Sequence, residues 1–97
     1  MTKVYYTNRA RLDLADLSEY IARDSPSNAE AFISKLMKKA ERIALAPRIY
    51  RRRDDLAEDM RSAAFGNHLI FFRVSEEGIE ILRIVHGGRD LPRLFEK

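Results

Sequence analysis

The sequence predicts an α+β fold: a short strand, a helical hairpin, and then a three-stranded antiparallel meander. Two observations support this. In the first half of the chain, apolar residues recur every three or four positions, as they do on one face of an α-helix. In the second half, three β-prone segments are separated by two short turn sequences. Helical and strand segments that are segregated along the chain in this way are typical of α+β domains.

The first element is a β-prone segment, VYYT at 4–7, and a helix follows it. From Asn8 onward the apolar residues are spaced by four, three and four positions, with charged residues between them. This spacing places them in one stripe on a helix, and either Thr7 or Asn8 can cap its first turn. The stripe consists of Ala10, Leu14, Leu17 and Ile21.

A second, longer helix is predicted after the polar segment DSPSNAE. Ser25 before Pro26 is a cap followed by proline in the first turn, and Ser27 with Glu30 forms an alternative capping box. The helix should end before Pro47, which cannot continue it. Because the link between the two helices is short, they should pack as an antiparallel hairpin. The apolar stripe is Ala29, Phe32, Ile33, Leu36, Met37, Ala40, Ile43 and Ala44.

Three strands complete the predicted fold. MRSAAF (60–65) and HLIFFRV (68–74) flank the dipeptide Gly66-Asn67, which is a hairpin signal. HLIFFRV and IEILRIVH (79–86) flank SEEG, a second turn. The tail DLPRLFEK is too short to assign.

Length and composition narrow the class of protein. A chain of 97 residues predicts one domain spanning 1–97. Without cysteine, no disulfide or thiolate metal site can form, which fits the reducing cytoplasm. No segment has the apolar run of a signal peptide or a membrane span. The excess of 18 Lys and Arg over 15 Asp and Glu is mild and does not by itself indicate nucleic-acid binding. We expect neither a metal nor a cofactor.

Simple turns would fix which residues share a sheet face. In that register Val74 faces Ile79, Arg73 faces Glu80, and Ile70 faces Arg83. Since burying unpaired cations is costly, we expect the helices to cover the face without them, and the cationic face to stay partly open. An alternative is that the tail or the first helix covers this second face. The predicted covered face carries Met60, Ala64, Leu69, Phe71, Leu82 and Ile84; the predicted open face carries Arg61, His68, Ile70, Phe72, Ile81, Arg83 and Val85.

The order of elements, the middle strand "HLIFFRV" and the last strand "IEILRIVHGGRD" together resemble the RelE/ParE superfamily of type II toxins. The tail "LPRLF" is similar to ParE tails. The resemblance covers essentially the whole chain. It implies one of two activities: RelE-like members are ribosome-dependent mRNA endoribonucleases, and ParE-like members trap DNA gyrase in its cleaved-DNA state. It also implies a cognate antitoxin, for ParE typically a ribbon-helix-helix protein that alone carries the operator-binding function.

The resemblance favours the ParE activity. RNA cleavage needs a base, an acid and cations for the phosphorane charge. The position of one RelE-like arginine is His68 here, Arg89 matches a second, and Phe95 stands where RelE has a proton-transferring tyrosine. Some members use a Glu and a His, which Glu58 and His86 could imitate, but the simple register puts His86 and His68 on opposite faces. A ribonuclease would therefore have to use an incomplete set, namely Arg61, His68, Arg83, His86 and Arg89.

Two surfaces follow as expectations. The open face should hold the antitoxin, through Arg61, Ile70, Phe72, Ile81 and Arg83. The exit of the last strand and the tail should contact gyrase, through Arg89, Asp90, Leu91, Leu94 and Phe95. The basic stretch RIYRRR (48–53) should be a solvated loop, because the carboxylates of residues 54, 55, 58 and 59 almost cancel its charge. A non-toxic binding module with the same fold is a third interpretation.

Overall fold

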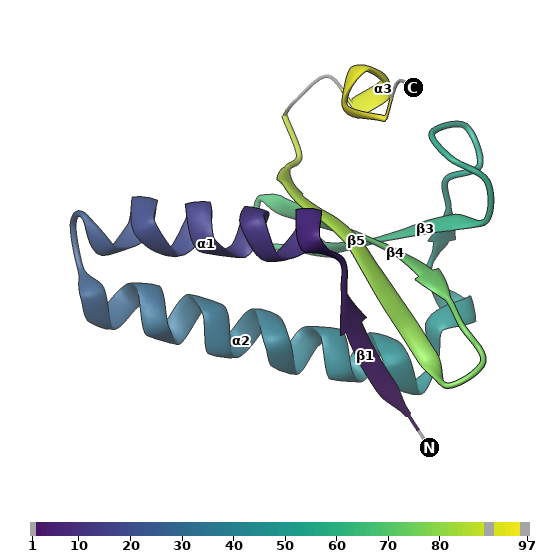
Figure 1. Cartoon of the computed structure of the whole chain (residues 1–97), viewed down its shortest axis with the longest axis horizontal. Helices are drawn as coiled ribbons and strands as arrows, with labels where there is room; N and C mark the ends of the chain where they lie inside the picture. Colours follow the sequence, from purple (N-terminus) through teal and green to yellow (C-terminus); the bar gives the residue numbers. More distant parts are fainter. Residues whose placement is uncertain (1, 89–90, 96–97) are drawn as a thin grey trace.

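The computed structural model describes residues 2–88 and 91–95, which form one five-stranded sheet, two long helices and a short C-terminal helix (Figure 1). The spatial order of the strands is β1-β5-β4-β3-β2, with β1 parallel to β5 and the other pairs antiparallel. This arrangement confirms the predicted α+β class and the order of strand, helical hairpin and meander. The elements are β1 (Lys3–Tyr6), α1 (Asn8–Ala22), α2 (Pro26–Leu45), the 3₁₀ turn η1 (Pro47–Ile49), β2 (Arg51–Arg52), β3 (Met60–Phe65), β4 (His68–Val74), β5 (Gly78–His86) and α3 (Leu91–Leu94).

The two long helices begin and end where local sequence signals place them. The Thr7 hydroxyl accepts a hydrogen bond from the Ala10 N–H at 3.0 Å, so Thr7 caps α1. The Ser25 hydroxyl accepts from the Asn28 N–H at 3.3 Å, and Pro26 occupies the first turn of α2. The helices lie side by side on one face of the sheet (Figure 1). Capping by a side chain that precedes each helix therefore fixes where both helices begin.

The register of the first hairpin is confirmed and that of the second is wrong beyond its turn. Phe65 faces His68 around Gly66, whose φ of 57° suits glycine. Val74 faces Ile79 as predicted, but the register shifts between Phe71 and Phe72. Leu82 is the additional residue of a β-bulge, so Ile70 faces Ile84 and not Arg83. A bulge leaves no local sequence signal in this strand, which is why simple pairing failed.

The helices cover the opposite face from the one predicted. The main core contains Ala63, Ile70, Phe72 and Ile81 from the sheet, with α2 residues packed on them. We expected unpaired cations to keep this face open. However, Arg83 is paired with Asp13, and Arg61 donates to two backbone carbonyls. The main core comprises Ala10, Leu36, Ala40, Ile43, Ala44, Ala63, Ile70, Phe72, Ile79, Ile81 and Ile84.

The other face of the sheet carries a second, smaller core. Met60, Phe71 and Val85 are buried there. Leu91, Leu94 and Phe95 of the tail pack over them, and the rings of Phe71 and Phe95 meet edge to face at 5.0 Å. The tail therefore covers the face that we assigned to the helices, so both faces of the sheet are protected.

One buried carboxylate joins α1 to the edge of β5. β1 covers this edge only as far as Ile81, where the chain turns into α1. Beyond that point Asp13 accepts the Ile84 N–H at 2.9 Å and two bonds from the Arg83 guanidinium, at 2.9 and 3.2 Å. Both side chains are buried, with 8% and 10% of their areas exposed. Arg83 is thus an internal partner of the first helix and does not project from an open face.

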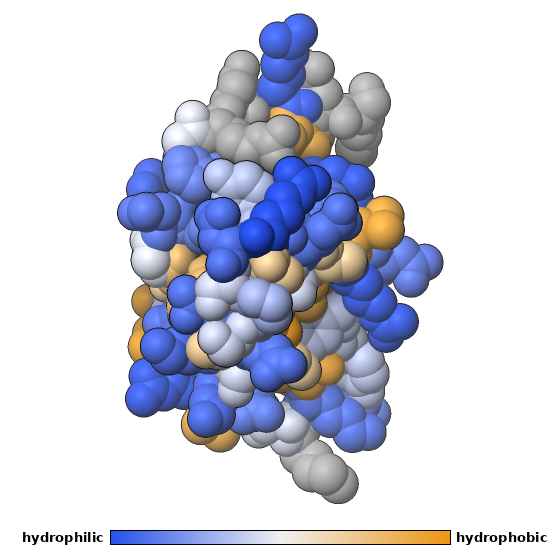
Figure 2. Space-filling model, turned by 90° about the vertical axis from the view of Figure 1, so that its left-hand side faces the viewer, coloured by the Kyte–Doolittle hydropathy of each residue, from blue (hydrophilic) through white to orange (hydrophobic). Residues whose placement is uncertain are grey.

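The outer surface is mostly polar. Figure 2 views the end of the molecule that carries the α1–α2 turn, and hydrophilic side chains cover most of it, with hydrophobic ones scattered between them. Within the described part of the chain, no helix is long and apolar enough to cross a membrane.

Replacing Asp13 with Asn should destabilise the fold by about 3 kcal/mol, because it leaves the Arg83 charge buried without a counter-charge. Urea unfolding followed by circular dichroism measures this change. Asp16→Asn, an exposed carboxylate on the same helix, is the matched control and should change stability by less than about 0.5 kcal/mol. Equal stabilities of the two variants would contradict the role assigned to Asp13.

Candidate functional site

His68 and His86 face each other on neighbouring strands, contrary to the sequence prediction. They are register partners on β4 and β5, with ring centroids 5.6 Å apart. The Nδ1 atom of His86 accepts the Gly88 N–H at 3.2 Å, which leaves its Nε2 atom available. The bulge at Leu82 causes this pairing, since it shifts every later residue of β5 by one position. The structure thus brings together the two imidazoles that simple pairing kept apart.

The pKa of His68 is lowered from its ordinary value of 6.5 by partial burial and, to a smaller extent, by the neighbouring His86. Its ring also packs edge to face on Phe32 of α2, with centroids 5.4 Å apart. At neutral pH this environment favours an uncharged His68. An uncharged imidazole is a potential proton acceptor, but it cannot supply the positive charge that an arginine at this position would give.

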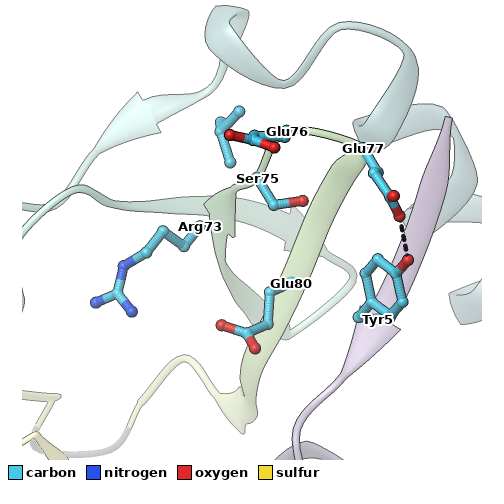
Figure 3. Close-up of a pocket in the computed structure, with 7 residues that line it drawn as sticks. Tyr5, Arg73, Ser75, Glu76, Glu77 and Glu80 are labelled. Atoms are coloured by element: carbon cyan, nitrogen blue, oxygen red, sulfur yellow. Dashed lines mark hydrogen bonds between the residues drawn. The ribbon is translucent and has the colours of Figure 1, made fainter. Parts of the chain in front are cut away.

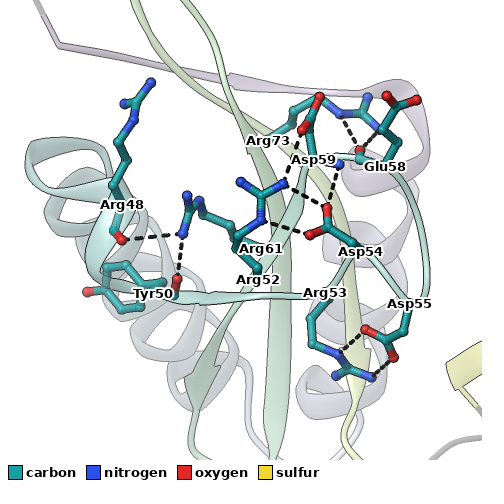
Figure 4. A network of polar contacts seen from close by, with 10 residues as sticks. All are labelled: Arg48, Tyr50, Arg52, Arg53, Asp54, Asp55, Glu58, Asp59, Arg61 and Arg73. Atoms are coloured by element: carbon teal, nitrogen blue, oxygen red, sulfur yellow. Dashed lines mark hydrogen bonds and ion pairs between the residues drawn. The ribbon is translucent and has the colours of Figure 1, made fainter.

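Of the other ribonuclease candidates, Arg89 lies outside the described residues, and the rest are placed or bound away from the histidine pair. Arg61 is on β3, four residues from the partner of His68, or about 13 Å along the strand. Its guanidinium donates to the backbone carbonyls of Arg48 and Tyr50 at 3.3 and 2.9 Å (Figure 4). Arg83 is bound to Asp13. Glu58 lies by Arg73, at the opposite end of β4 from His86, so these two cannot imitate an acid–base pair.

Two of the four arginines in the basic stretch 48–53 are paired with the carboxylates that follow, and the stretch is more ordered than the predicted loop. Arg52 binds Asp54 at 2.8 Å and Asp59 at 3.3 Å, and Arg53 binds Asp55 at 3.0 Å (Figure 4). The Arg52 guanidinium lowers the pKa of Asp54, and Arg53 does the same for Asp55. Two residues of this stretch form β2, a short edge strand that the sequence analysis missed.

The residues predicted to bind an antitoxin do not form an exposed surface. Ile70, Phe72 and Ile81 are fully buried under the helices, and Arg83 is buried with Asp13. Only Arg61 of this set is partly exposed. Our assignment of an open apolar face is therefore wrong, because α2 occupies it.

The residues predicted to bind a target fall into two groups. Arg89 and Asp90 lie outside the described residues. Leu91, Leu94 and Phe95 are half-buried and belong to the second core. The tail therefore has a structural role, and its partly exposed apolar atoms remain available at the surface.

A pocket of about 390 Å³ lies at the turn between β4 and β5, and the sequence analysis did not identify it (Figure 3). Three carboxylates line it, from Glu76, Glu77 and Glu80, together with Arg73 and Tyr5. The Tyr5 hydroxyl donates to Glu77, and this bond raises the pKa of Tyr5. The acidic SEEG turn was the available signal, but the contribution of Tyr5 depends on the parallel pairing of β1. In the described parts of the chain, no group of three or more potential ligands is arranged for a metal ion.

Comparisons with known proteins agree with this fold. The family model described as "ParE toxin of type II toxin-antitoxin system, parDE" matches residues 4–91. The chain is 35% identical over 66 residues to Toxin ParE1 of Mycobacterium tuberculosis, which covers 67% of each protein. A solved structure of the chromosomal ParDE system from P. aeruginosa superposes with a TM-score of 0.74 at 20% identity, covering 89% of this chain and 96% of that one.

A second solved structure, the toxin–antitoxin complex RelBE2 from M. tuberculosis, superposes with a TM-score of 0.58 at 26% identity, covering 88% of this chain and 96% of that one. The fold and these similarities define a toxin of the type II toxin–antitoxin systems, within the RelE/ParE superfamily. More specifically, the chain belongs to the ParE toxin family.

The stability of the chain should depend on the ionisation of His68. Because the folded state lowers its pKa, the unfolded chain takes up this proton first as the pH falls. The free energy of unfolding should therefore decrease as the pH falls through 6.5 toward the lower pKa that His68 has in the folded state. Denaturant titrations at pH 7.5 and 5 compare wild type with His68→Gln, in which this loss should be smaller.

His86→Gln is the matched control for that comparison. It should weaken the pH dependence only in part, because burial is the larger cause of the shift and His86 the smaller. An unchanged pH dependence in His68→Gln would show that another group is responsible.

Proposed function

We propose that this toxin acts by binding DNA gyrase, that it does not cleave RNA, and that a ParD-like ribbon-helix-helix antitoxin neutralises it in a hetero-oligomer. The observation that carries the proposal is that two of the candidate arginines, Arg61 and Arg83, are already bound to other groups of the fold. Arg83 is held by Asp13 inside the fold, and Arg61 is held by two backbone carbonyls. A phosphorane charge needs cations that are free to meet it.

The missing proton donor gives a second line of support. Phe95, at the position that resembles the RelE tyrosine, packs against Phe71 and has no exchangeable proton. The four tyrosines are placed elsewhere: Tyr5 is bound to Glu77 at the other end of β5, Tyr6 pairs with Ile81 from β1, Tyr20 is exposed on α1, and Tyr50 packs against Phe72. Together these features favour binding over acid–base chemistry.

The antitoxin must use a surface other than the one that the sequence suggested. Ile70, Phe72, Ile81 and Arg83 are internal, so a partner cannot reach them in this fold. In the proposal the antitoxin alone contacts operator DNA, as the family resemblance implies. The apolar atoms of Leu91 and Leu94, half-exposed on the tail, are candidates for contact with the target.

A ribosome-dependent endoribonuclease is the second candidate, because one observation favours it. His68 and His86 lie within 5.6 Å of each other at the end of the sheet from which the chain leads to Arg89. An uncharged and a more exposed imidazole could act as base and acid. The likeness to the RelBE2 complex is compatible with this candidate.

Purified toxin should inhibit supercoiling by gyrase and increase its cleaved-DNA complexes, while leaving mRNA on translating ribosomes intact. Gel assays of plasmid topology and primer extension on ribosome-bound mRNA measure the two activities. Cleaved mRNA that disappears in a His68→Gln, His86→Gln variant would establish the ribonuclease instead. Neither activity would indicate a binding module that keeps the fold without toxicity.

Toxicity should depend more on Arg89 than on the basic loop. Arg89 follows two glycines after β5 in the sequence, whereas Arg52 and Arg53 of the loop are paired with carboxylates. We expect Arg89→Ala to reduce growth inhibition at least tenfold. Arg51→Ala, which removes an exposed cation from β2, is the matched control and should remain toxic. The opposite ranking, with both variants folded, would place the target surface on the loop.

A further inference from the structure

A groove of about 440 Å³ lies between the outer side of α2 and the turn that joins β3 and β4. Its helical wall consists of Lys35, Lys38, Lys39 and Arg42. These residues follow the spacing i, i+3, i+4 and i+7, so they form one row on the helix. The row spans about 10 Å at the rise of an α-helix. Its other wall is the end of β3, with Ala64, Phe65 and Gly66.

The positive charge of this row is not compensated within the fold. None of the four side chains forms an ion pair within residues 2–88 and 91–95, whereas Arg52, Arg53 and Arg83 are all paired with carboxylates. Lys39 lies 5.4 Å from the centre of the Tyr50 ring, which anchors one member of the row. The other three are exposed.

The row has no evident structural purpose. Like charges four residues apart on a helix repel each other and reduce its stability, and this row contains two such pairs. Arg42 lies in the last turn, where a cation complements the helix dipole. Lys35 and Lys38 lie well before that turn, so the dipole does not account for them. The repulsion within the row and the absence of a structural role for Lys35 and Lys38 indicate an external anion.

We propose that this groove binds the phosphodiester backbone of a nucleic acid. A row of about 10 Å suits a repeating anion better than one compact phosphate. Three of its four members are lysines, which meet phosphates as point charges. An acidic peptide would also need apolar anchors, and the groove offers only Ala64 and the half-buried Phe65.

The strand wall adds a hydrogen-bond donor. The Arg53 N–H donates to the Met60 carbonyl, and Arg51 pairs with Ser62, so the even-numbered residues of β3 direct their backbone groups toward β2. Arg51, the first residue of β2, pairs with Ser62, so β2 does not extend as far as Ala64. By the same alternation, the Ala64 N–H points to the side of β3 that β2 leaves uncovered. Because Ala64 lines the groove, this N–H can donate to a phosphate oxygen bound there.

This inference goes beyond the proposed function, because it holds whether the nucleic acid is DNA on gyrase or RNA on the ribosome. The test measures fluorescence anisotropy of full-length toxin with a short labelled DNA duplex and a single-stranded RNA of equal length, over a salt series. The groove variant combines Lys35→Gln, Lys38→Gln and Arg42→Gln. The matched control combines Arg11→Gln, Arg23→Gln and Arg51→Gln, which remove the same charge elsewhere.

Wild type should bind, and the groove variant should bind at least tenfold more weakly. Its slope of log affinity against log salt should be shallower by about 2.7 for duplex DNA or about 2.1 for single-stranded RNA. Tighter binding of one probe shows whether the groove prefers the phosphodiester backbone of DNA or that of RNA. The control should keep the wild-type slope, and the thermal midpoint of the groove variant should not fall.

Equal losses in both variants would reduce the effect to net charge and overturn the proposal. The proposal would also be overturned if the toxin bound neither nucleic acid, even if a poly-glutamate peptide, measured in the same assay, did bind. Failure here leaves the gyrase assay unaffected, because that assay needs no free nucleic-acid binding. The two proposals can therefore fail separately.

Discussion

The rest of the structure depends on the carboxylate of Asp13. This side chain supplies a partner for the Ile84 N–H, which β1 is too short to reach, and for the buried guanidinium of Arg83. It is carried by α1, so satisfying the strand edge also fixes the helix against the sheet. Because an unpaired N–H or a lone buried charge is costly, few other positions of α1 are compatible with this edge.

The β-bulge at Leu82 and this contact are spatially linked. The bulge interrupts β5 beside Arg83 and reverses the orientation of the residues that follow. As a result Ile84 joins the main core, Val85 joins the second core, and His86 meets His68. The local irregularity of one strand therefore determines which side chains reach the end of the sheet that carries His68 and His86.

The distribution of charge separates structural from available cations. Arg52, Arg53 and Arg83 are paired with carboxylates, and Arg61 and Arg73 donate to backbone carbonyls, so only part of the charge in the most basic stretch of the sequence is left unpaired. The row on α2 has fewer consecutive cations but retains its charge. The role of the apolar tail residues is also not evident from the sequence. They complete the second core, yet part of their surface remains exposed.

The sequence by itself determined the first strand, the two long helices, the three strands of the meander and their order, but not the edge strand β2 or the short helix α3. Helix caps at Thr7 and Ser25, the break at Pro47 and the turn at Gly66 are local features, and each follows from residues a few positions apart. It also carried the resemblance that led to the family. Only the tertiary structure decided which sheet face the helices cover, where the register shifts, and which cations are bound to carboxylates or carbonyls of the fold. Those outcomes depend on residues such as Asp13 and Arg83, which lie 70 positions apart, and no local pattern records that they meet.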